Sequence, residues 1–210
     1  MLTVLCVLRS GGIYDAEWVR KLHDSADRQI VGPHKFVCMS DVDVPCERIR
    51  LAQDWPSWWS KLEMFRPGVI DGPTIYFDLD TILVGKIDAS VPVDFAMLRN
   101  FWNPQMVGSG VMWFSGVNVP HHVYTKFAKQ PMAYIKHHER TADGPYIGDQ
   151  AFTWDAMKRE VAQINDYLPG IYSYKMHCTK RLPTDASIVC FHGKPRPTEV
   201  VTDWMKTHWA

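Results

Sequence analysis

The segment PTIYFDLDTILVG, residues 73–85, decides which fold the chain is expected to adopt. Its residues Thr74–Phe77 favour β-structure and run directly into an Asp-Leu-Asp triplet, after which an apolar run resumes. The pattern predicts a strand over residues 74–80 that carries two carboxylates, Asp78 and Asp80, at its end. Two carboxylates so placed can bind a divalent cation, can act as the nucleophile and acid/base pair of a phosphatase, or can simply form a turn.

Residues before the triplet alternate apolar runs with amphipathic stretches, as in α/β proteins built on a parallel sheet. The run LTVLCVL is largely apolar, which is typical of a parallel strand covered on both faces. In this part of the chain we predict strands over residues 2–8, 35–40 and 47–52, and helices over 15–27 and 57–66. Since parallel strands end on one edge of a sheet, we expect Arg9, Ser10 and the triplet on the same rim.

The second half of the chain predicts further elements around the same sheet. We predict strands over 94–100, 109–115, 163–168 and 187–193, helices over 121–130, 149–160 and 197–210, and a polar loop over 136–148. The whole pattern indicates one α/β domain over residues 1–210 with right-handed crossovers.

Composition narrows the class of protein. The 23 Lys and Arg balance the 23 Asp and Glu, which argues against a nucleic-acid partner. Five scattered cysteines without a CxxC pair indicate reduced thiols, and hence a cytoplasmic location. The apolar N-terminal run is too short for a membrane span and lacks the basic start of a signal peptide, so we expect no transmembrane segment.

Three further segments carry groups suited to phosphate or metal binding. FHGKP follows a predicted strand and offers the His192 imidazole, which suits Mn²⁺ better than Mg²⁺. In the same segment, Gly193 permits close backbone approach and Lys194 can meet a phosphate as a point charge. GDQ, residues 148–150, supplies a carboxylate and an amide at a helix start, and Lys61 lies on the helix before the triplet.

The triplet also resembles a phosphatase motif. FDLDTIL is close to FDLDGTL, the first motif of the haloacid-dehalogenase-like phosphohydrolases, which would use Asp78 and Asp80, and GDQAFTWD imitates that family's late metal motif. Thr81 stands where that family has glycine, Asp155 lies farther from Asp149 than the family's spacing, and the triplet follows a fourth strand instead of a first. A phosphohydrolase of this kind is one alternative for the function of the chain, and a non-enzymatic, metal-dependent sugar-binding module is a second.

Taken in order, the motifs resemble those of the GT-A-fold glycosyltransferases, particularly the retaining glycogenin and lipopolysaccharide galactosyltransferase type. The resemblance rests on an N-terminal nucleotide-binding strand, the SKLEMF helix, IYFDLDTILVG, GSGVMWF, GDQ and HGKP, and it spans nearly the whole chain. It implies a single Rossmann-like GT-A domain with a mixed, mainly parallel central sheet flanked by helices. The nucleotide-binding part would be residues 1–90 and the acceptor and closing part residues 91–210.

The resemblance also implies roles for particular residues. Mn²⁺ or Mg²⁺ would be bound by Asp78, Asp80 and His192, and Asp149 and Gln150 would lie beside the donor sugar as candidate catalytic residues. The implied donor-binding residues are Leu8, Arg9, Ser10, Lys61, Phe77, Leu79, Ser109, Gly110, Gly193 and Lys194.

The implied reaction is transfer of a sugar from a nucleoside diphosphate sugar, expected to be a UDP-sugar, to an acceptor hydroxyl with retention of configuration. The acceptor, whether glycan, lipid or protein, is left open. The closing pattern HxxGxxKPW of these enzymes is compressed here to HGKP, so His192 departs further from the family pattern than the two aspartates do.

Overall fold

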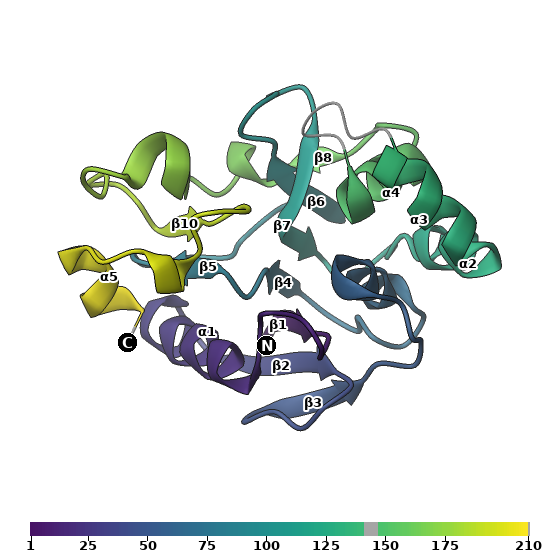
Figure 1. Ribbon diagram of the computed structural model, residues 1–210, viewed down its shortest axis with the longest axis horizontal. Helices are drawn as coiled ribbons and strands as arrows, with labels where there is room; N and C mark the ends of the chain where they lie inside the picture. Colours follow the sequence, from purple (N-terminus) through teal and green to yellow (C-terminus); the bar gives the residue numbers. More distant parts are fainter. Residues whose placement is uncertain (141–146, 210) are drawn as a thin grey trace.

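A seven-stranded sheet runs through the middle of the computed structural model, which describes residues 1–140 and 147–209 (Figure 1). The strand order is β3-β2-β1-β4-β7-β6-β8. Neighbouring strands are parallel except that β7 runs antiparallel to both β4 and β6, so the predicted mixed, mainly parallel sheet is confirmed. The strands are β1 (Leu2–Leu8), β2 (His34–Ser40), β3 (Glu47–Arg50), β4 (Thr74–Phe77), β6 (Phe95–Arg99), β7 (Val107–Phe114) and β8 (Ala162–Gln163).

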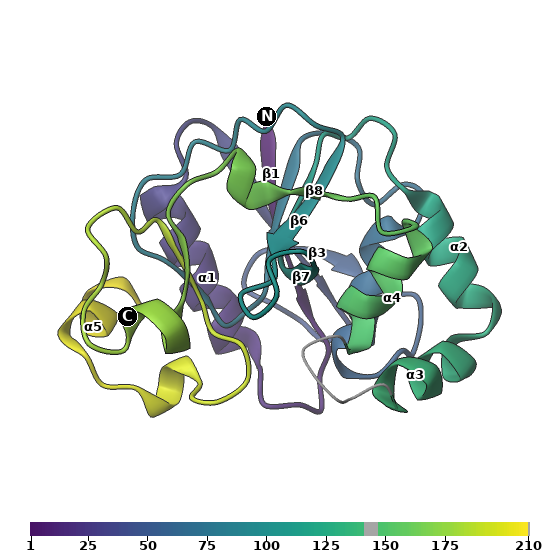
Figure 2. The same ribbon diagram turned by 90° about the horizontal axis from the view of Figure 1, so that it is seen from above.

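The sheet separates two hydrophobic cores, because successive side chains of a strand point to opposite faces. In β1, Val4 and Cys6 belong to the core under helix α1 (Ala16–Gln29), whereas Leu5 and Val7 belong to the core on the other face. Figure 2 shows α1 on one side of the sheet and α2, α3 and α4 on the other. The apolar run of the first strand is therefore explained by cover on both faces.

Helix α1 covers the first face. Its N-cap is Asp15, whose carboxylate accepts a hydrogen bond from the backbone N–H of Glu17 (3.0 Å), as the sequence predicted. Trp18, Val19 and Leu22 turn inward at helical spacing. The end of the chain packs beside this helix, since the Trp209 ring meets the Trp18 ring with centroids 5.0 Å apart (Figure 1).

The opposite face is covered by helices rich in aromatic residues. These are the 3-10 helix η1 (Ser57–Phe65), α2 (His121–Lys129), α3 (Pro131–Arg140) and α4 (Gly148–Ala156). Phe127 stacks on Trp59 with ring centroids 5.2 Å apart and meets Trp55 and Phe152 edge-on at 4.7 and 5.0 Å. The cluster joins η1, α2 and α4 into one layer over the sheet.

A smaller sheet returns the end of the chain to the rim of the large one. It consists, in order, of β5 (Thr81–Leu83), β10 (Ile188–Cys190) and β9 (Ile171–Ser173). β10 is antiparallel to β5, with Cys190 opposite Thr81, and the N–H of Phe191 donates to the carbonyl of Asp80 (3.2 Å). The segment after β10 is thereby held against the Asp-Leu-Asp triplet.

The remaining elements are short. They are the 3-10 turns η2 (Ile164–Asp166) and η4 (Pro197–Glu199), the π-helical turn η3 (Tyr174–Cys178) and helix α5 (Asp203–His208). Within residues 1–140 and 147–209, no helix has both the length and the apolar character needed to cross a membrane.

The strand predicted over residues 163–168 is wrong beyond its first residue. β8 ends at Gln163, and the chain then turns so that the N–H of Leu168 donates to the carbonyl of Ile164 (2.9 Å). Ile164 and Leu168 are both buried in the core under α1. Their spacing of four residues is that of a helical turn, which the apolar pattern alone did not distinguish from a strand.

The loop predicted over residues 136–148 is wrong at both ends. α3 continues to residue 140 because Ile135 and His138, three residues apart, are buried on the same side of a helix. α4 begins at Gly148, where the predicted loop was to end. The rest of that prediction, over residues 141–146, lies outside the described residues.

The C-terminal helix predicted over residues 197–210 is interrupted. The backbone N–H of Arg196 donates to the Glu199 carboxylate (2.7 Å), which closes a separate 3-10 turn. Val200 is then extended, and α5 begins only at Asp203.

Replacing Phe127 with alanine should lower the free energy of unfolding by about 3–5 kcal/mol. The fully buried ring joins three helices, and its removal leaves a cavity between them. Urea unfolding measures the loss. The control Val201→Ala removes a side chain that is 84% exposed and should change the value by less than about 0.5 kcal/mol. Equal, small losses in both variants would contradict the packing described for this layer.

Candidate functional site

The Asp-Leu-Asp triplet lies on the rim where β1 and β2 also end. β4 pairs in parallel with β1, with Tyr76 opposite Leu5, so the residues after both strands emerge on the same edge. The shared rim predicted for Arg9, Ser10 and the triplet is therefore confirmed. The N–H of Asp78 donates to the carbonyl of Gly110 (2.9 Å), which ties the triplet to β7.

Lys61 joins the triplet to two other predicted site residues. Its ammonium lies 2.8 Å from the carboxylate of Asp78, 3.3 Å from that of Asp149 and 3.1 Å from the hydroxyl of Ser109. The Tyr76 hydroxyl donates to the same Asp78 oxygen at 2.6 Å. These groups come from η1, the end of β4, β7 and α4, so one buried cation connects four elements.

The charges in this cluster control one another's protonation. Burial lowers the pKa of Lys61, but the carboxylates of Asp149 and Asp78 outweigh burial and raise that pKa above its ordinary value. Burial raises the pKa of Asp149, and the Lys61 ammonium opposes the rise. Lys61 is therefore a permanent cation between two acids.

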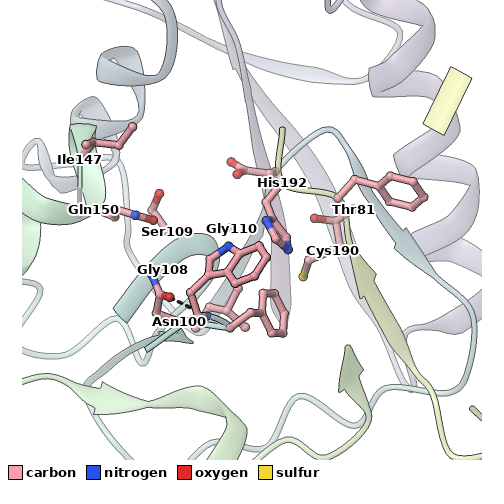
Figure 3. Close-up of a pocket in the computed structure, with 14 residues that line it drawn as sticks. Thr81, Asn100, Gly108, Ser109, Gly110, Ile147, Gln150, Cys190 and His192 are labelled. Atoms are coloured by element: carbon pink, nitrogen blue, oxygen red, sulfur yellow. Dashed lines mark hydrogen bonds between the residues drawn. The ribbon is translucent and has the colours of Figure 1, made fainter. Parts of the chain in front are cut away.

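A cavity of about 240 Å³ opens beside this cluster (Figure 3). Figure 3 shows Ile147 and Gln150 on one side of it and His192 and Cys190 on the other. Its lining includes five of the predicted site residues, which are Asp78, Ser109, Gly110, Gln150 and His192. Carboxylate, hydroxyl, amide and imidazole groups thus face one small space, an arrangement suited to a polar ligand.

Asp80 is bound by residues that the sequence did not single out. Its buried carboxylate accepts a 2.7 Å hydrogen bond from the Tyr14 hydroxyl and forms an ion pair with Arg196, which also donates to the Tyr14 oxygen (2.6 Å). Burial, together with the charge of Asp78, raises the pKa of Asp80 to about 6. The available signal for Arg196 was its position in the basic segment that follows His192.

His192 is held as a neutral imidazole at the cavity wall. Its Nε2 lies 2.7 Å from the hydroxyl of Ser173, and its ring stacks on Phe101 with centroids 5.4 Å apart. Burial, then the nearby Lys175 ammonium, lowers the pKa of His192 to about 4. A neutral ring keeps a nitrogen lone pair available as a ligand or acceptor.

Gly193 and Lys194, which follow His192, do not line the cavity. Gly193 has φ +75°, and a side chain there would come within 3.3 Å of the Lys175 ammonium, so the position favours glycine. Lys194 is exposed at the surface. In the described structure, Arg196 is the basic group of this segment that reaches the triplet, through Asp80.

The predicted nucleoside side of the site is built from backbone and surface groups. The side chains of Leu8, Phe77 and Leu79 are buried in the core under α1, which leaves only their backbone for a ligand. The N–H of Ser10 donates to Asp41 at 2.8 Å, and the Arg9 guanidinium lies 3.2 Å from the same carboxylate. Asp41 directly follows the second strand, a strand-end position that could have identified it from sequence.

The donor set around the triplet fits a divalent cation in its chemistry, because two carboxylates and a neutral imidazole are ligands that Mn²⁺ accepts. The geometry is not preassembled: across residues 1–140 and 147–209, no three His, Cys, Asp or Glu side chains gather as a metal-binding group. Arg196 supplies the positive charge at Asp80, and His192 is bonded to Ser173.

No protein-family model and no curated protein matches the chain. It nevertheless shares its fold with solved glycosyltransferases, which confirms the GT-A fold that the resemblance implied. One is the glycosyltransferase GlyE of Streptococcus pneumoniae TIGR4, with a TM-score of 0.69 at 13% identity over 99% of this chain and 60% of GlyE. Apo-form GlyE gives a TM-score of 0.62 at 14% identity over 98% of this chain and 58% of GlyE.

A further structure of this fold is the galactosyltransferase LgtC in complex with donor and acceptor sugar analogs. It gives a TM-score of 0.60 at 9% identity over 93% of this chain and 88% of LgtC. The chain spans about 60% of the length of GlyE and most of the length of LgtC. At these identities the likeness establishes the fold.

Replacing Lys61 with methionine should lower the free energy of unfolding by about 3–5 kcal/mol, because two carboxylates then lose the cation they share. Adding Asp149→Asn to the same chain removes one stranded charge and should recover part of the loss. Urea unfolding of the single and double variants measures the coupling. Purely additive losses would show that the cluster is not coupled.

Proposed function

We propose that the chain is a glycosyltransferase that moves a sugar from a nucleoside diphosphate sugar, a UDP-sugar, to an acceptor hydroxyl with retention of configuration. The observation that carries the proposal is the cluster in which Lys61 joins Asp78, Asp149 and Ser109 at the wall of a polar cavity. The fold shared with GlyE and LgtC supports the same reading.

The cavity suits the donor sugar. Ser109 and Gln150 line it and offer hydroxyl and amide groups to sugar hydroxyls. Asp149 is buried and paired with Lys61, so its role in the proposal is to hold that cation in place. Gln150, the next residue on α4, is the member of the pair that meets the sugar.

The residues proposed to hold Mn²⁺ or Mg²⁺ are Asp78, Asp80 and His192. When bound, such a cation supplies positive charge that stabilises a departing diphosphate. Arg196 forms an ion pair with Asp80, and its side chain is 26% exposed. In the proposal, Arg196 leaves Asp80 and binds the phosphates of the donor. A guanidinium can do this because it binds two phosphate oxygens with the same paired N–H groups that it uses to bind a carboxylate.

The phosphohydrolase alternative is less well supported. A nucleophilic carboxylate needs an accessible oxygen, and one Asp78 oxygen already accepts from both Lys61 and Tyr76. The triplet follows the fourth strand of the chain, which also departs from that family's order.

A non-catalytic sugar-binding module is the second alternative. Such a module would bind UDP no better than free sugar and would not hydrolyse the donor on long incubation.

A thermal-shift panel of nucleotide sugars with and without Mn²⁺ tests the proposal and narrows the donor. A ligand at 100 times its Kd should stabilise the native state by about 2.7 kcal/mol. We expect UDP-sugars to raise the Tm only when Mn²⁺ is present. Absence of any metal-dependent shift across UDP, GDP and ADP sugars would refute the proposed activity.

Replacing Asp80 with asparagine should abolish Mn²⁺-dependent UDP binding, because the carboxylate that would hold the cation becomes a neutral amide of the same shape. Isothermal titration calorimetry with UDP and Mn²⁺ measures the loss. Asp203→Asn is the matched control, since that carboxylate is fully exposed on α5. Unchanged UDP affinity in Asp80→Asn would remove Asp80 from the site.

Replacing Arg196 with alanine should raise the affinity for Mn²⁺ alone about fivefold or more, because no guanidinium then competes for Asp80. The same variant should bind UDP more weakly in the presence of Mn²⁺. The Mn²⁺ affinity is measured by titrating Mn²⁺ and following the electron paramagnetic resonance spectrum of the free ion. The exposed Arg181→Ala should match the unmodified protein; equal Mn²⁺ affinity in all three proteins would contradict the exchange.

A further inference from the structure

An exposed tryptophan stands at the mouth of the cavity. Trp102 lines the cavity and is 59% exposed, more than any other tryptophan of the chain, whereas Trp55, Trp59 and Trp113 are buried. Its ring meets the edge of the His192 ring, with centroids 5.9 Å apart and planes at 88°. A large apolar ring left in water beside a polar cavity is typical of a ligand contact.

The exposed ring belongs to a fixed loop between β6 and β7. The buried side chain of Asn100 accepts hydrogen bonds from the backbone N–H groups of Trp102 (2.9 Å) and Asn103 (3.1 Å). Gln163 donates to the carbonyl of Pro104 at 2.7 Å and anchors the loop tip to β8. The loop therefore holds Trp102 at one place on the rim, which reduces the ordering cost of a contact.

The opposite wall of the mouth is also apolar. Ile147 is 37% exposed and Trp58 is 46% exposed. Trp58 lies against Gly148, where a side chain would come within 2.7 Å of the indole nitrogen. Trp102 and Ile147 thus line the cavity together with the polar side chains of Ser109 and Gln150, and Trp58 lies beside this wall, against Gly148.

We propose that the acceptor is a glycan and that the face of Trp102 is the platform for the sugar ring that carries the accepting hydroxyl. A pyranose has one face of C–H groups and a periphery of hydroxyls, which matches an indole face bordered by polar groups. A lipid chain would need an enclosed groove lined by apolar groups, whereas the lining of this cavity includes the polar side chains of Asp78, Ser109 and Gln150. The inference rests on the proposed transferase function and adds the class of acceptor.

The position of Trp102 separates this role from donor binding. The donor nucleoside is assigned to the rim after β1, at Arg9 and Ser10, and the donor sugar to the cavity beside Asp78. Trp102 lines the cavity and is largely exposed, so its ring is open to an acceptor that arrives from solvent. A platform there places the acceptor hydroxyl next to the sugar it receives.

Saturation-transfer NMR tests the platform with methyl glycosides of glucose, galactose and N-acetylglucosamine, in the presence of UDP and Mn²⁺. The unmodified protein should transfer saturation to at least one glycoside. Trp102→Ala should reduce the signal at least fivefold, and Trp102→Phe should retain most of it. The control Tyr167→Ala removes an exposed aromatic ring outside the cavity and should leave the signal unchanged.

Calorimetry with UDP and Mn²⁺ is run on the same proteins and should give equal affinities in all of them. Equal glycoside signals in Trp102→Ala and the unmodified protein would overturn the platform. UDP binding by the unmodified protein without any glycoside signal would overturn it too. Neither of these two results contradicts the transferase proposal. Loss of UDP affinity in Trp102→Ala would assign the indole to the nucleotide base instead. Absence of UDP binding to the unmodified protein would overturn the transferase proposal and the platform with it.

Discussion

The Lys61 ammonium is the interaction on which the candidate site depends. It lies between the carboxylates of Asp78 and Asp149 and within hydrogen-bond distance of Ser109, so it fixes η1, the end of β4, β7 and α4 relative to one another. Removing the Lys61 cation would leave the carboxylates of Asp78 and Asp149 without their shared partner, which is costly where the surroundings have a low dielectric constant. Asp78 and Ser109, which both contact this cation, form one part of the cavity lining.

The second constraint is the antiparallel pairing of β10 with β5. The pairing brings the end of the chain back to the triplet, and the hydrogen bond from Phe191 to Asp80 fixes the register. His192 and Arg196 reach the site only because of this return. The two halves of the site, far apart in sequence, are therefore joined by backbone hydrogen bonds between β5 and β10 and by the side-chain pairing of Arg196 with Asp80.

Sequence predicted the parts of the structure that depend on local pattern. The apolar run of β1, the Asp15 cap of α1 and the strand that ends in the triplet follow from periodicity and capping, and the shared rim follows from parallel pairing. Of the small sheet, β10 lies within the strand predicted over residues 187–193, whereas β5 and β9 were missed because these three-residue strands are defined by partners distant in the chain. Arg196 and Tyr14 were missed for the same reason, since only tertiary contact with Asp80 distinguishes them from surface residues.

Through the ion pair between Arg196 and Asp80, the chain itself supplies a counter-ion to the triplet. In the proposed function, a metal that binds Asp80 would replace a guanidinium that already offsets the charge of this carboxylate. The exchange would replace one positive charge with two, which changes the field at the surrounding core less than a divalent cation entering beside an unpaired carboxylate. Under that proposal the exchange would need the movement of one partly exposed side chain, that of Arg196, and no change in the buried Lys61 cluster.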